Sequence, residues 1–306
     1  MKTLETLKRQ IHTADDLATV VRTMKALAAV NIRQYEAAAD SLGKYQETIE
    51  QAVRMLVWNS RGLAAERKPS RASRIGLIAF GSDQGMCGGF NESLGQFVVD
   101  SFDKLRSEGS DVRLVVLGRR LADRLLETGL VFDNLFDLPG AVSGMTAMLQ
   151  DLLPWIDRWR TEHHLASLMV CHHRRLTRTN YGPVDRTLLP VAPQHFVESP
   201  SRRWTGQSLP LVTMPPEQLW RAIVRQYLFV SLFQACAESQ ASENAARITA
   251  MQSAETHIHD RLGELQLDYQ HMRQTSITEE LLEVITGFEA LTTPHPQRRN
   301  RPETVP

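Results

Sequence analysis

The N-terminal segment of the chain carries an apolar repeat with a period of 3.5 residues. From Leu4 to Leu56, apolar residues recur at alternating steps of three and four, and only Lys25 and Gln46 interrupt the series. The segment contains no proline, and Gly43 is its only glycine. A repeat sustained over this length is typical of a helix that supercoils around a partner. One helix over these residues would be roughly 80 Å long, which is more than a compact domain can contain.

The C-terminal third repeats this pattern. Between Glu217 and Leu291 there is no proline, and apolar residues again alternate by three and four from Ile258 onward. A step of five at residues 274–276 moves the apolar seam to another face of the helix. Small side chains allow two helices to approach closely, and a run of them precedes the seam: Ala235, Ala237, Ala241, Ala245, Ala246, Ala250 and Ala254. The two ends therefore predict long helices that pair as an antiparallel coiled coil.

The middle of the chain alternates short apolar runs, rich in β-branched residues, with helical patterns. Strands are expected at residues 75–80, 112–118, 165–173 and 185–191, with helices at 91–106, 119–128 and 143–162. Alternation of this kind is typical of a parallel sheet. The predicted fold class is an α/β central domain, Rossmann-like with a mostly parallel sheet, flanked by the long N- and C-terminal helices. The predicted boundaries are 1–62 for the first helix, 72–212 for the central domain, 217–291 for the second helix and 292–306 for a polar, proline-containing tail expected to be disordered.

Composition excludes several classes of protein. The 35 basic residues balance 35 acidic ones, so no global charge attracts nucleic acid. No apolar stretch approaches the roughly 20 residues that cross a bilayer, so we expect no direct membrane insertion. Cys87, Cys171 and Cys236 are scattered, which argues against a disulfide framework or a zinc site and favours a reducing compartment.

One segment could carry chemistry, the glycine-rich run GSDQGMCGGFN at residues 81–91. It follows the first expected strand and precedes a helix, where phosphate-binding loops lie. It lacks the Gly-Lys-Ser/Thr of a P-loop, and its glycines have the wrong spacing for a dinucleotide fingerprint. A tight strand-to-helix turn with glycines at positive φ is favoured over nucleotide binding.

Other reactive residues receive structural interpretations. Cys87 is favoured as a buried thiol over a nucleophile, because no partner is specified. The pairs His163–His164 and His172–His173 are interpreted as surface residues, and His257 and His259 point to different helix faces. No catalytic group, metal site or cofactor is predicted. Judged by its position alone, Lys25 is slightly favoured as a lysine whose alkyl chain packs at the seam edge over a charge presented to a partner.

Four segments together resemble the gamma subunit of F-type ATP synthases. Arg22–Glu36 (RTMKALAAVNIRQYE) is similar to the core of the family's N-terminal helix. Ser82–Asn91 (SDQGMCGGFN) matches the family loop Ser-Asp-x-Gly-Leu-Cys-Gly-Gly-x-Asn. Glu238–Met251 (ESQASENAARITAM) and Leu262–Leu291 resemble the conserved run and the C-terminal signature of its last helix. These segments lie in the family's order and span both ends of the chain.

The resemblance implies a function. In this family the paired helices form a rotor shaft inside a ring of alpha and beta subunits, and the α/β domain forms a foot on the membrane c-ring beside the epsilon subunit. The shaft passes ion-driven rotation to catalytic beta subunits and is not itself an enzyme. The implied location is the cytoplasmic face of the bacterial inner membrane, peripheral to it.

The resemblance also implies roles for individual residues. The positions that match family contacts with the alpha and beta ring are Met24, Lys25, Arg247, Arg273, Gln274 and Thr278. The match for Lys25 makes the partner-facing interpretation the preferred one. The positions that match the family's structural loop are Ser82, Asp83, Gly85, Cys87, Gly88, Gly89 and Asn91. The chain departs from the family at residues 12–16, at Leu27 and at Phe288, and it extends beyond Leu291, where the family usually ends.

Two other classes compete with this interpretation. An α/β enzyme with coiled-coil arms would need a binding fingerprint and catalytic groups in the middle domain, and neither is found. A coiled-coil scaffold or adaptor with an α/β domain explains the helices but not the detailed match over residues 82–91.

Overall fold

The computed structural model describes residues 3–59, 74–176, 181–191 and 213–292. Contacts between residues divide the chain into two compact units. The smaller unit combines Met1–Arg22 with Ser253–Pro306, and the larger unit is Thr23–Gln252. Among the described residues, no helix combines the length and the apolar character needed to cross a membrane.

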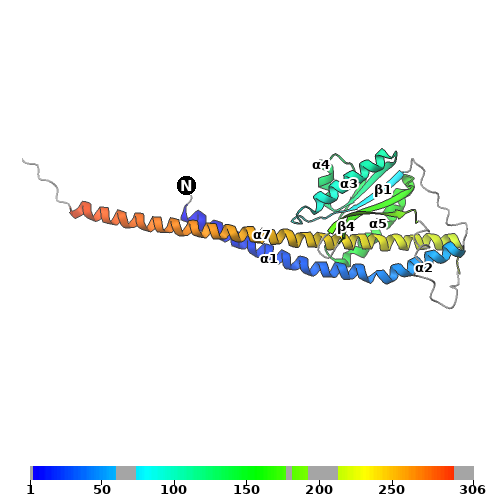
Figure 1. Cartoon of the computed structure of the whole chain (residues 1–306), viewed down its shortest axis with the longest axis horizontal. Coiled ribbons are helices and arrows are strands. Elements are labelled where there is room, and N and C mark those ends of the chain that lie inside the picture. Colours follow the sequence, from blue (N-terminus) through cyan, green and yellow to red (C-terminus); the bar gives the residue numbers. More distant parts are fainter. Residues whose placement is uncertain (1–2, 60–73, 177–180, 192–212, 293–306) are drawn as a thin grey trace, which may run out of the picture. The chain divides into compact units, whose positions relative to one another are not determined.

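The N-terminal helical segment is broken once. Helix α1 covers Leu4–Ser41 and helix α2 covers Gly43–Asn59 (Figure 1). The expectation of one helix over residues 4–56 is therefore wrong at Leu42. The physical reason is Gly43, because a glycine loses more backbone entropy in a helix than any other residue and is a common site of breaks. The C-terminal helix α7 runs without interruption from Pro216 to Thr292. Proline suits its first turn, where the missing N–H has no helical partner.

A five-stranded sheet in the order β3-β2-β1-β4-β5 forms the middle of the larger unit. Its strands are β1 Arg74–Phe80, β2 Asp111–Leu117, β3 Asn134–Phe136, β4 Ser167–Arg175 and β5 Tyr181–Leu189. The first four pair in parallel and β5 pairs antiparallel with β4, which confirms the mostly parallel sheet. Five residues separate β4 from β5, whereas a parallel crossover needs a dozen or more. The three-residue strand β3 was not predicted.

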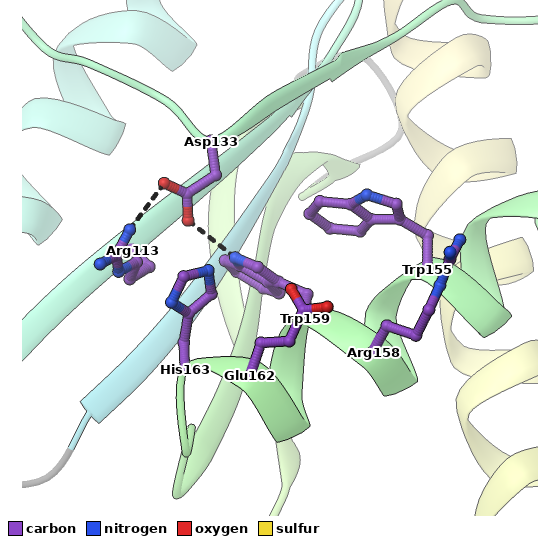
Figure 2. A pocket seen from close by; sticks show the side chains of 7 residues that line it. All are labelled: Arg113, Asp133, Trp155, Arg158, Trp159, Glu162 and His163. Carbon is purple, nitrogen blue, oxygen red and sulfur yellow. Dashed lines mark hydrogen bonds and ion pairs between the residues drawn. The ribbon is translucent and has the colours of Figure 1, made fainter.

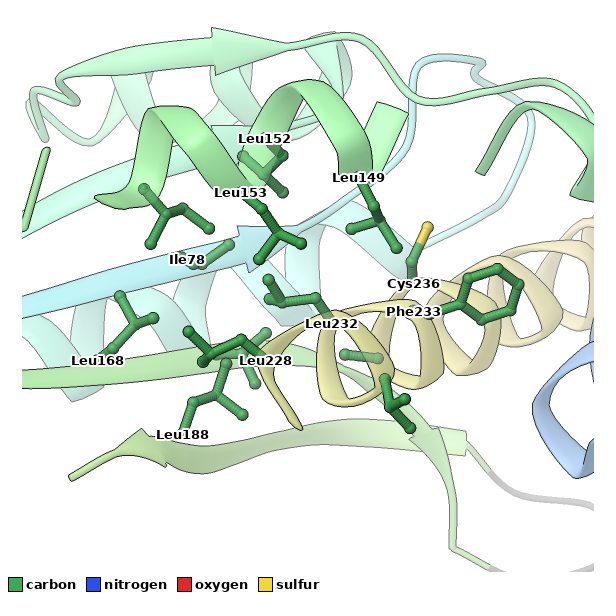
Figure 3. Close-up of a cluster of buried hydrophobic side chains, with 14 of the residues drawn as sticks. Ile78, Leu149, Leu152, Leu153, Leu168, Leu188, Leu228, Leu232, Phe233 and Cys236 are labelled. Atoms are coloured by element: carbon green, nitrogen blue, oxygen red, sulfur yellow. The ribbon is translucent and has the colours of Figure 1, made fainter. Parts of the chain in front are cut away.

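Helices cover both faces of this sheet. Helices α3 (Phe90–Ser107) and α4 (Arg119–Glu127) pack on one face, around Leu77, Leu94 and Leu121. Helix α5 (Val142–Glu162) and the first half of α7 pack on the other face. Figure 3 shows the core that they share. Its labelled residues come from α5, α7 and three strands: Ile78, Leu149, Leu152, Leu153, Leu168, Leu188, Leu228, Leu232, Phe233 and Cys236.

The first alanines of the run lie where helix α7 is most deeply buried, whereas Ala245, Ala246, Ala250 and Ala254 are half-buried. Ala235, Ala237 and Ala241 are each at most 4% exposed. The same core also contains Tyr35 from α1 and Ile49 from α2. Small side chains therefore let the N-terminal helices and the sheet approach α7 from opposite directions.

The pairing of the terminal helices is antiparallel. Within the larger unit, the Tyr45 hydroxyl lies 3.1 Å from the Gln226 Oε1 atom. Ten residues earlier in the chain, Tyr35 lines a hollow together with Glu243. Moving back along the N-terminal helices from Tyr45 to Tyr35 therefore means moving forward along α7 from Gln226 to Glu243. This confirms the predicted antiparallel direction. Within the smaller unit, the Arg22 Nε atom lies 3.5 Å from Glu255 Oε1.

Candidate functional site

The sheet changes its winding direction between β1 and β4. In open α/β sheets, ligands bind in the crevice outside the carboxyl ends of the strands at such a point. In this protein, helix α7 itself lies against the carboxyl ends of these two strands. Ser239 donates a hydrogen bond of 2.8 Å to the carbonyl oxygen of Phe80, the last residue of β1. The Glu238 carboxylate lies 2.9 Å from the Nε2 atom of His172 near the end of β4. The chain's own helix therefore contacts the edge that binds a ligand in enzymes of this architecture.

The loop after β1 is held together by its own side chains. Asn91 donates from Nδ2 to the Ser82 hydroxyl over 2.8 Å and accepts from the Ser82 N–H over 3.2 Å. Ser82 also donates to the Gln84 carbonyl over 3.0 Å. These bonds connect the first and last positions of the matched motif. The Ser and Asn types at its ends are therefore explained by turn geometry, since short polar side chains satisfy loop backbone groups.

Asp83 joins this loop to two other segments. Its Oδ1 atom accepts the backbone N–H of Arg119, the first residue of α4, over 2.8 Å. Its Oδ2 atom accepts the backbone N–H of Leu138 over 2.6 Å. A carboxylate at the first N–H of a helix satisfies an orphan donor and interacts favourably with the helix dipole.

Glycine is required where the loop passes the β2–α4 turn. Gly118 has a φ of +106°, and a Cβ atom there would lie 2.7 Å from the backbone nitrogen of Ser82. Within the loop, Gly88 adopts a φ of +57°, as expected for a turn, and the non-glycine Met86 adopts a φ of +62°. Met86 is 58% exposed. A left-handed conformation costs a non-glycine residue roughly 1–2 kcal/mol.

A buried ion pair on α7 faces the same loop. Arg247 is 7% exposed, pairs with Glu243, and donates to the carbonyl oxygen of Gly85 over 3.4 Å. The Arg247 Nε atom is buried without a hydrogen-bond partner among the described residues. A hollow of about 60 Å³ beside the pair is lined by Asn31 and Tyr35 of α1. Burial raises the pKa of Glu243, against the opposite effect of Arg247. Burial likewise raises the pKa of Tyr35 to about 12.

Cys87 lies inside the loop network. Its side chain is 3% exposed, and its sulfur lies 3.6 Å from Asn91 Nδ2 and 3.8 Å from the Ser82 hydroxyl. Burial raises the pKa of the thiol. A protonated, buried thiol lacks the exposure and thiolate character of a reactive cysteine.

The interpretation of His172 and His173 as surface residues is wrong. Each is 4% exposed, because β4 is an interior strand covered on both faces. His172 faces α7, whereas the Nε2 atom of His173 lies 3.0 Å from the Phe90 carbonyl and its ring stacks on Phe90 at 4.4 Å. Burial lowers the pKa of His173 to about 4. Their position at the end of an interior parallel strand was the signal that could have identified them.

The six predicted ring contacts are distributed over both units. Met24 and Lys25 are half-buried on α1 in the larger unit. Arg273, Gln274 and Thr278 are exposed on α7 in the smaller unit. Arg247 is the exception, because it is buried against groups of its own chain. Contact of these residues with another subunit stays a prediction.

A second hollow, of about 360 Å³, lies beside the amino ends of β1 and β2 (Figure 2). Asp133 accepts from both Arg113, over 3.0 Å, and the indole N–H of Trp159, over 2.7 Å. Trp155 stacks on Trp159 at 5.3 Å. The remaining lining residues are Arg158, Glu162 and His163. None of the described residues that line it is a serine, cysteine or threonine nucleophile. Among the described residues, no group of three or more His, Cys, Asp and Glu side chains could hold a metal ion.

Comparisons with known proteins agree over most of the chain. A family model described as ATP synthase matches residues 3–291. The ATP synthase gamma chain of Granulibacter bethesdensis is 28% identical, with 95% of this chain and 100% of the relative covered. The ATP synthase gamma chain of Moorella thermoacetica is 26% identical over the same shares.

Solved structures share the fold. A chain of the Euglena gracilis mitochondrial ATP synthase, from a cryo-EM structure of its OSCP, F1 and c-ring, gives a TM-score of 0.63 at 11% identity and covers 97% of this chain and 99% of its own. A chain from the central stalk and c-ring structure of the Tetrahymena thermophila mitochondrial ATP synthase gives a TM-score of 0.56 at 17% identity, with 77% of this chain and 99% of that chain covered.

Proposed function

The chain belongs to the ATP synthase family, whose model matches residues 3–291, and on this premise we propose that it is the central rotor shaft of an F-type ATP synthase. Family membership confirms the resemblance found in the four sequence segments, and the curated relatives that match are gamma chains. In the proposed role, the shaft transmits rotation of a membrane c-ring to catalytic beta subunits, for synthesis or hydrolysis of ATP.

One observation carries this proposal, the apolar surface at the end of α7. From Ile277 to Glu289 every side chain is exposed. Six of these are large and apolar, each at least 45% exposed: Ile277, Leu281, Leu282, Val284, Ile285 and Phe288. At 100° per residue they spread over about half of the helix circumference. An apolar surface of this kind on a helix supports burial by a surrounding partner.

The pattern changes where the burial within the chain ends. Leu265 is 4% exposed and is the last buried residue of α7 among those that the structure describes. The exposed stretch begins at Ile277, directly after the step in the apolar seam at residues 274–276. The proposed shaft leaves its helical partner at this step and enters a ring of alpha and beta subunits. Arg273, Gln274 and Thr278 lie at the entrance to that ring.

We assign no catalytic role to the chain. Helix α7 contacts the sheet edge where enzymes of this architecture bind ligands. The loop that resembled a phosphate cradle uses its polar side chains on its own backbone and on α3, α4 and residue 138. Both features support a structural use of the α/β fold. ATP hydrolysis in the complex would belong to the beta subunits.

The α/β domain is proposed to dock on the c-ring beside an epsilon subunit. The support is the sequence resemblance and the likeness to a chain from the Tetrahymena central stalk and c-ring. The chain would then lie peripherally at the cytoplasmic face of a bacterial inner membrane.

The test is purification of the tagged full chain from its native membrane, with mass spectrometry and an ATPase assay. We expect alpha and beta subunits in threefold excess over the chain, and ATPase activity in the complex but not in the chain alone. Leu281→Asp should weaken assembly with alpha and beta at least about tenfold, because it removes the burial of one large apolar side chain.

Leu126→Asp is the matched control. Leu126 is 55% exposed on α4, and Leu281 is 57% exposed on α7, so the two substitutions change exposed leucines equally. The control variant should assemble with the ring as the unmodified chain does. Recovery of the chain alone, ATPase activity of the chain by itself, or equal effects of the two substitutions on ring assembly would contradict the proposal.

A further inference from the structure

A cavity of about 320 Å³ lies where β4 and β5 meet helix α7, within the larger unit. Its lining includes His172 and Arg174 from β4, Arg186 from β5, and Gln234 and Glu238 from α7. The cavity has no part in the shaft function proposed above. Its size lies near the lower limit for small-molecule sites, so a compact ligand would fill it.

Two arginines lie on the face of the sheet that meets α7. Side chains alternate between the faces of a strand, so Arg174 shares the face of His172. The register pairs Val170 with Arg186 and His172 with Val184, which places Arg186 on that face too. Both guanidinium groups therefore belong to the cavity side of one antiparallel pair.

Neither cation has an acidic partner within the described ranges of the chain. Among the residues that the structure describes, Arg174 forms no hydrogen bond or ion pair, and Arg186 forms one long bond of 3.4 Å to the neutral amide oxygen of Gln234. By contrast, Arg175, the next residue on β4, pairs with Glu36 over 2.8 Å. Guanidinium groups beside a cavity without a carboxylate partner favour an oxyanion, which accepts their planar N–H groups in pairs.

The carboxylate on this side of the sheet is already used. Glu238 accepts from Gln234 through Oε1 over 2.9 Å, and its Oε2 lies 2.9 Å from His172 Nε2. Asp185 also lines the cavity, but the register pairs it with Cys171, so it belongs to the opposite face of β5. Of the two carboxylates that line the cavity, only Glu238 lies on the side of the sheet that carries the two arginines.

One residue that lines the cavity also has a buried polar atom without a partner among the described residues. His172 is 4% exposed, and its Nδ1 atom has no hydrogen-bond partner among the described residues. Buried polar atoms in folded proteins nearly always have partners, so an orphan in a cavity wall indicates a missing ligand or water. Because Nε2 is bonded to Glu238, Nδ1 of the neutral ring carries no hydrogen to offer an oxyanion. Arg174 and Arg186 are therefore the donors that a ligand requires.

We propose that this cavity binds a phosphate group, either free inorganic phosphate or the phosphate of a small molecule, between Arg174 and Arg186. The two positive charges of these arginines match the double charge of a phosphate dianion better than the single charge of a carboxylate ligand. The site lies beside the His172–Glu238 contact that joins β4 to α7, so a bound phosphate would bridge the sheet and the helix.

The test is calorimetric titration of the purified full chain with inorganic phosphate. We expect saturable binding at micromolar to millimolar concentrations. Arg174→Gln and Arg186→Gln should each weaken it by about tenfold or more, as expected for loss of one charge-assisted contact. Arg175→Gln is the matched control, because it removes the same charge from the adjacent residue, which is paired with Glu36. Circular dichroism would verify that all variants fold.

A second titration with ADP and ATP distinguishes the sources of the phosphate group. Binding of inorganic phosphate alone identifies a free oxyanion site. Tighter binding of a nucleotide, with the same dependence on Arg174 and Arg186, identifies the phosphate of a larger ligand. Nucleotide binding without hydrolysis would support this site and would agree with the non-catalytic shaft function proposed above. The proposal is overturned if no probe saturates, or if Arg175→Gln weakens binding as much as the two cavity variants do.

Discussion

Arg247 donates a hydrogen bond to the carbonyl oxygen of Gly85 over 3.4 Å and so joins helix α7 to the loop after β1, 162 positions earlier in the chain. Both residues belong to motifs that resemble the gamma family. The contact makes the two motifs parts of one structure, in which a buried guanidinium supports a loop that is otherwise closed by Ser82 and Asn91. A residue matched to a contact with another subunit thus has a role within its own chain.

The first prediction concerns this ion pair. Arg247→Met should lower the free energy of unfolding by about 3–5 kcal/mol, because it leaves Glu243 buried without its counter-ion. The double variant Arg247→Met with Glu243→Gln should recover part of the loss. Chemical denaturation followed by circular dichroism measures both.

The control for that prediction lies on the same helix. Arg261 pairs with Glu264, but both side chains are more than half exposed. Arg261→Met should therefore change the free energy of unfolding by less than about 1 kcal/mol. Equal losses for Arg247→Met and Arg261→Met would show that burial of the first pair has no energetic consequence.

The second prediction concerns the turn between β2 and α4. Gly118→Ala should destabilise the chain in two ways, through its φ of +106° and through a clash with the Ser82 backbone. Gly129→Ala separates the backbone strain from the steric clash, since Gly129 has a φ of +81° but open space around its Cβ position. The Gly129 variant should lose about 1–2 kcal/mol of unfolding free energy. The Gly118 variant should lose clearly more. Thermal and chemical denaturation compare the two, and similar losses would contradict the proposed close approach.

The third prediction concerns pH. Burial, with a smaller contribution from His172, lowers the pKa of His173 from 6.5 to about 4, although the hydrogen bond to the Phe90 carbonyl opposes this. The unfolded chain therefore binds this proton near pH 6.5 and the folded chain only near pH 4. Stability linked to His173 is constant above about pH 7 and falls as the pH decreases through this window. The total loss is about 3 kcal/mol.

His173→Gln tests this linkage, since its amide can still donate to the Phe90 carbonyl. The variant should show a shallower decrease in unfolding free energy between pH 7 and pH 4 than the unmodified chain. His257→Gln, at an exposed position of α7, should leave the pH dependence unchanged. A pH profile of His173→Gln that coincides with that of the unmodified chain would contradict the assignment.

Local patterns sufficed for the long helices, three of the parallel strands and the turn after β1. The absence of proline and the 3.5-residue repeats predict helix within residues 4–56 and 217–291, because only a helix returns those side chains to one seam, but they did not predict the break at Leu42. Short β-branched runs and glycine-rich turns likewise depend on neighbours in the chain. The same local information carried the family motifs, and with them the proposed function.

Only the tertiary structure decided which groups are buried and what they contact. Two adjacent histidines look like surface residues in the sequence, yet an interior strand covered on both faces buries both of them. Arg247 and Gly85, or Glu238 and His172, meet because the sheet and α7 pack together, and no sequence spacing encodes that distance. The antiparallel β5 and the three-residue β3 depend on pairing with a neighbouring strand. Burial and pairing are properties of segments distant in the chain, so the sequence by itself determined the elements while packing decided their contacts.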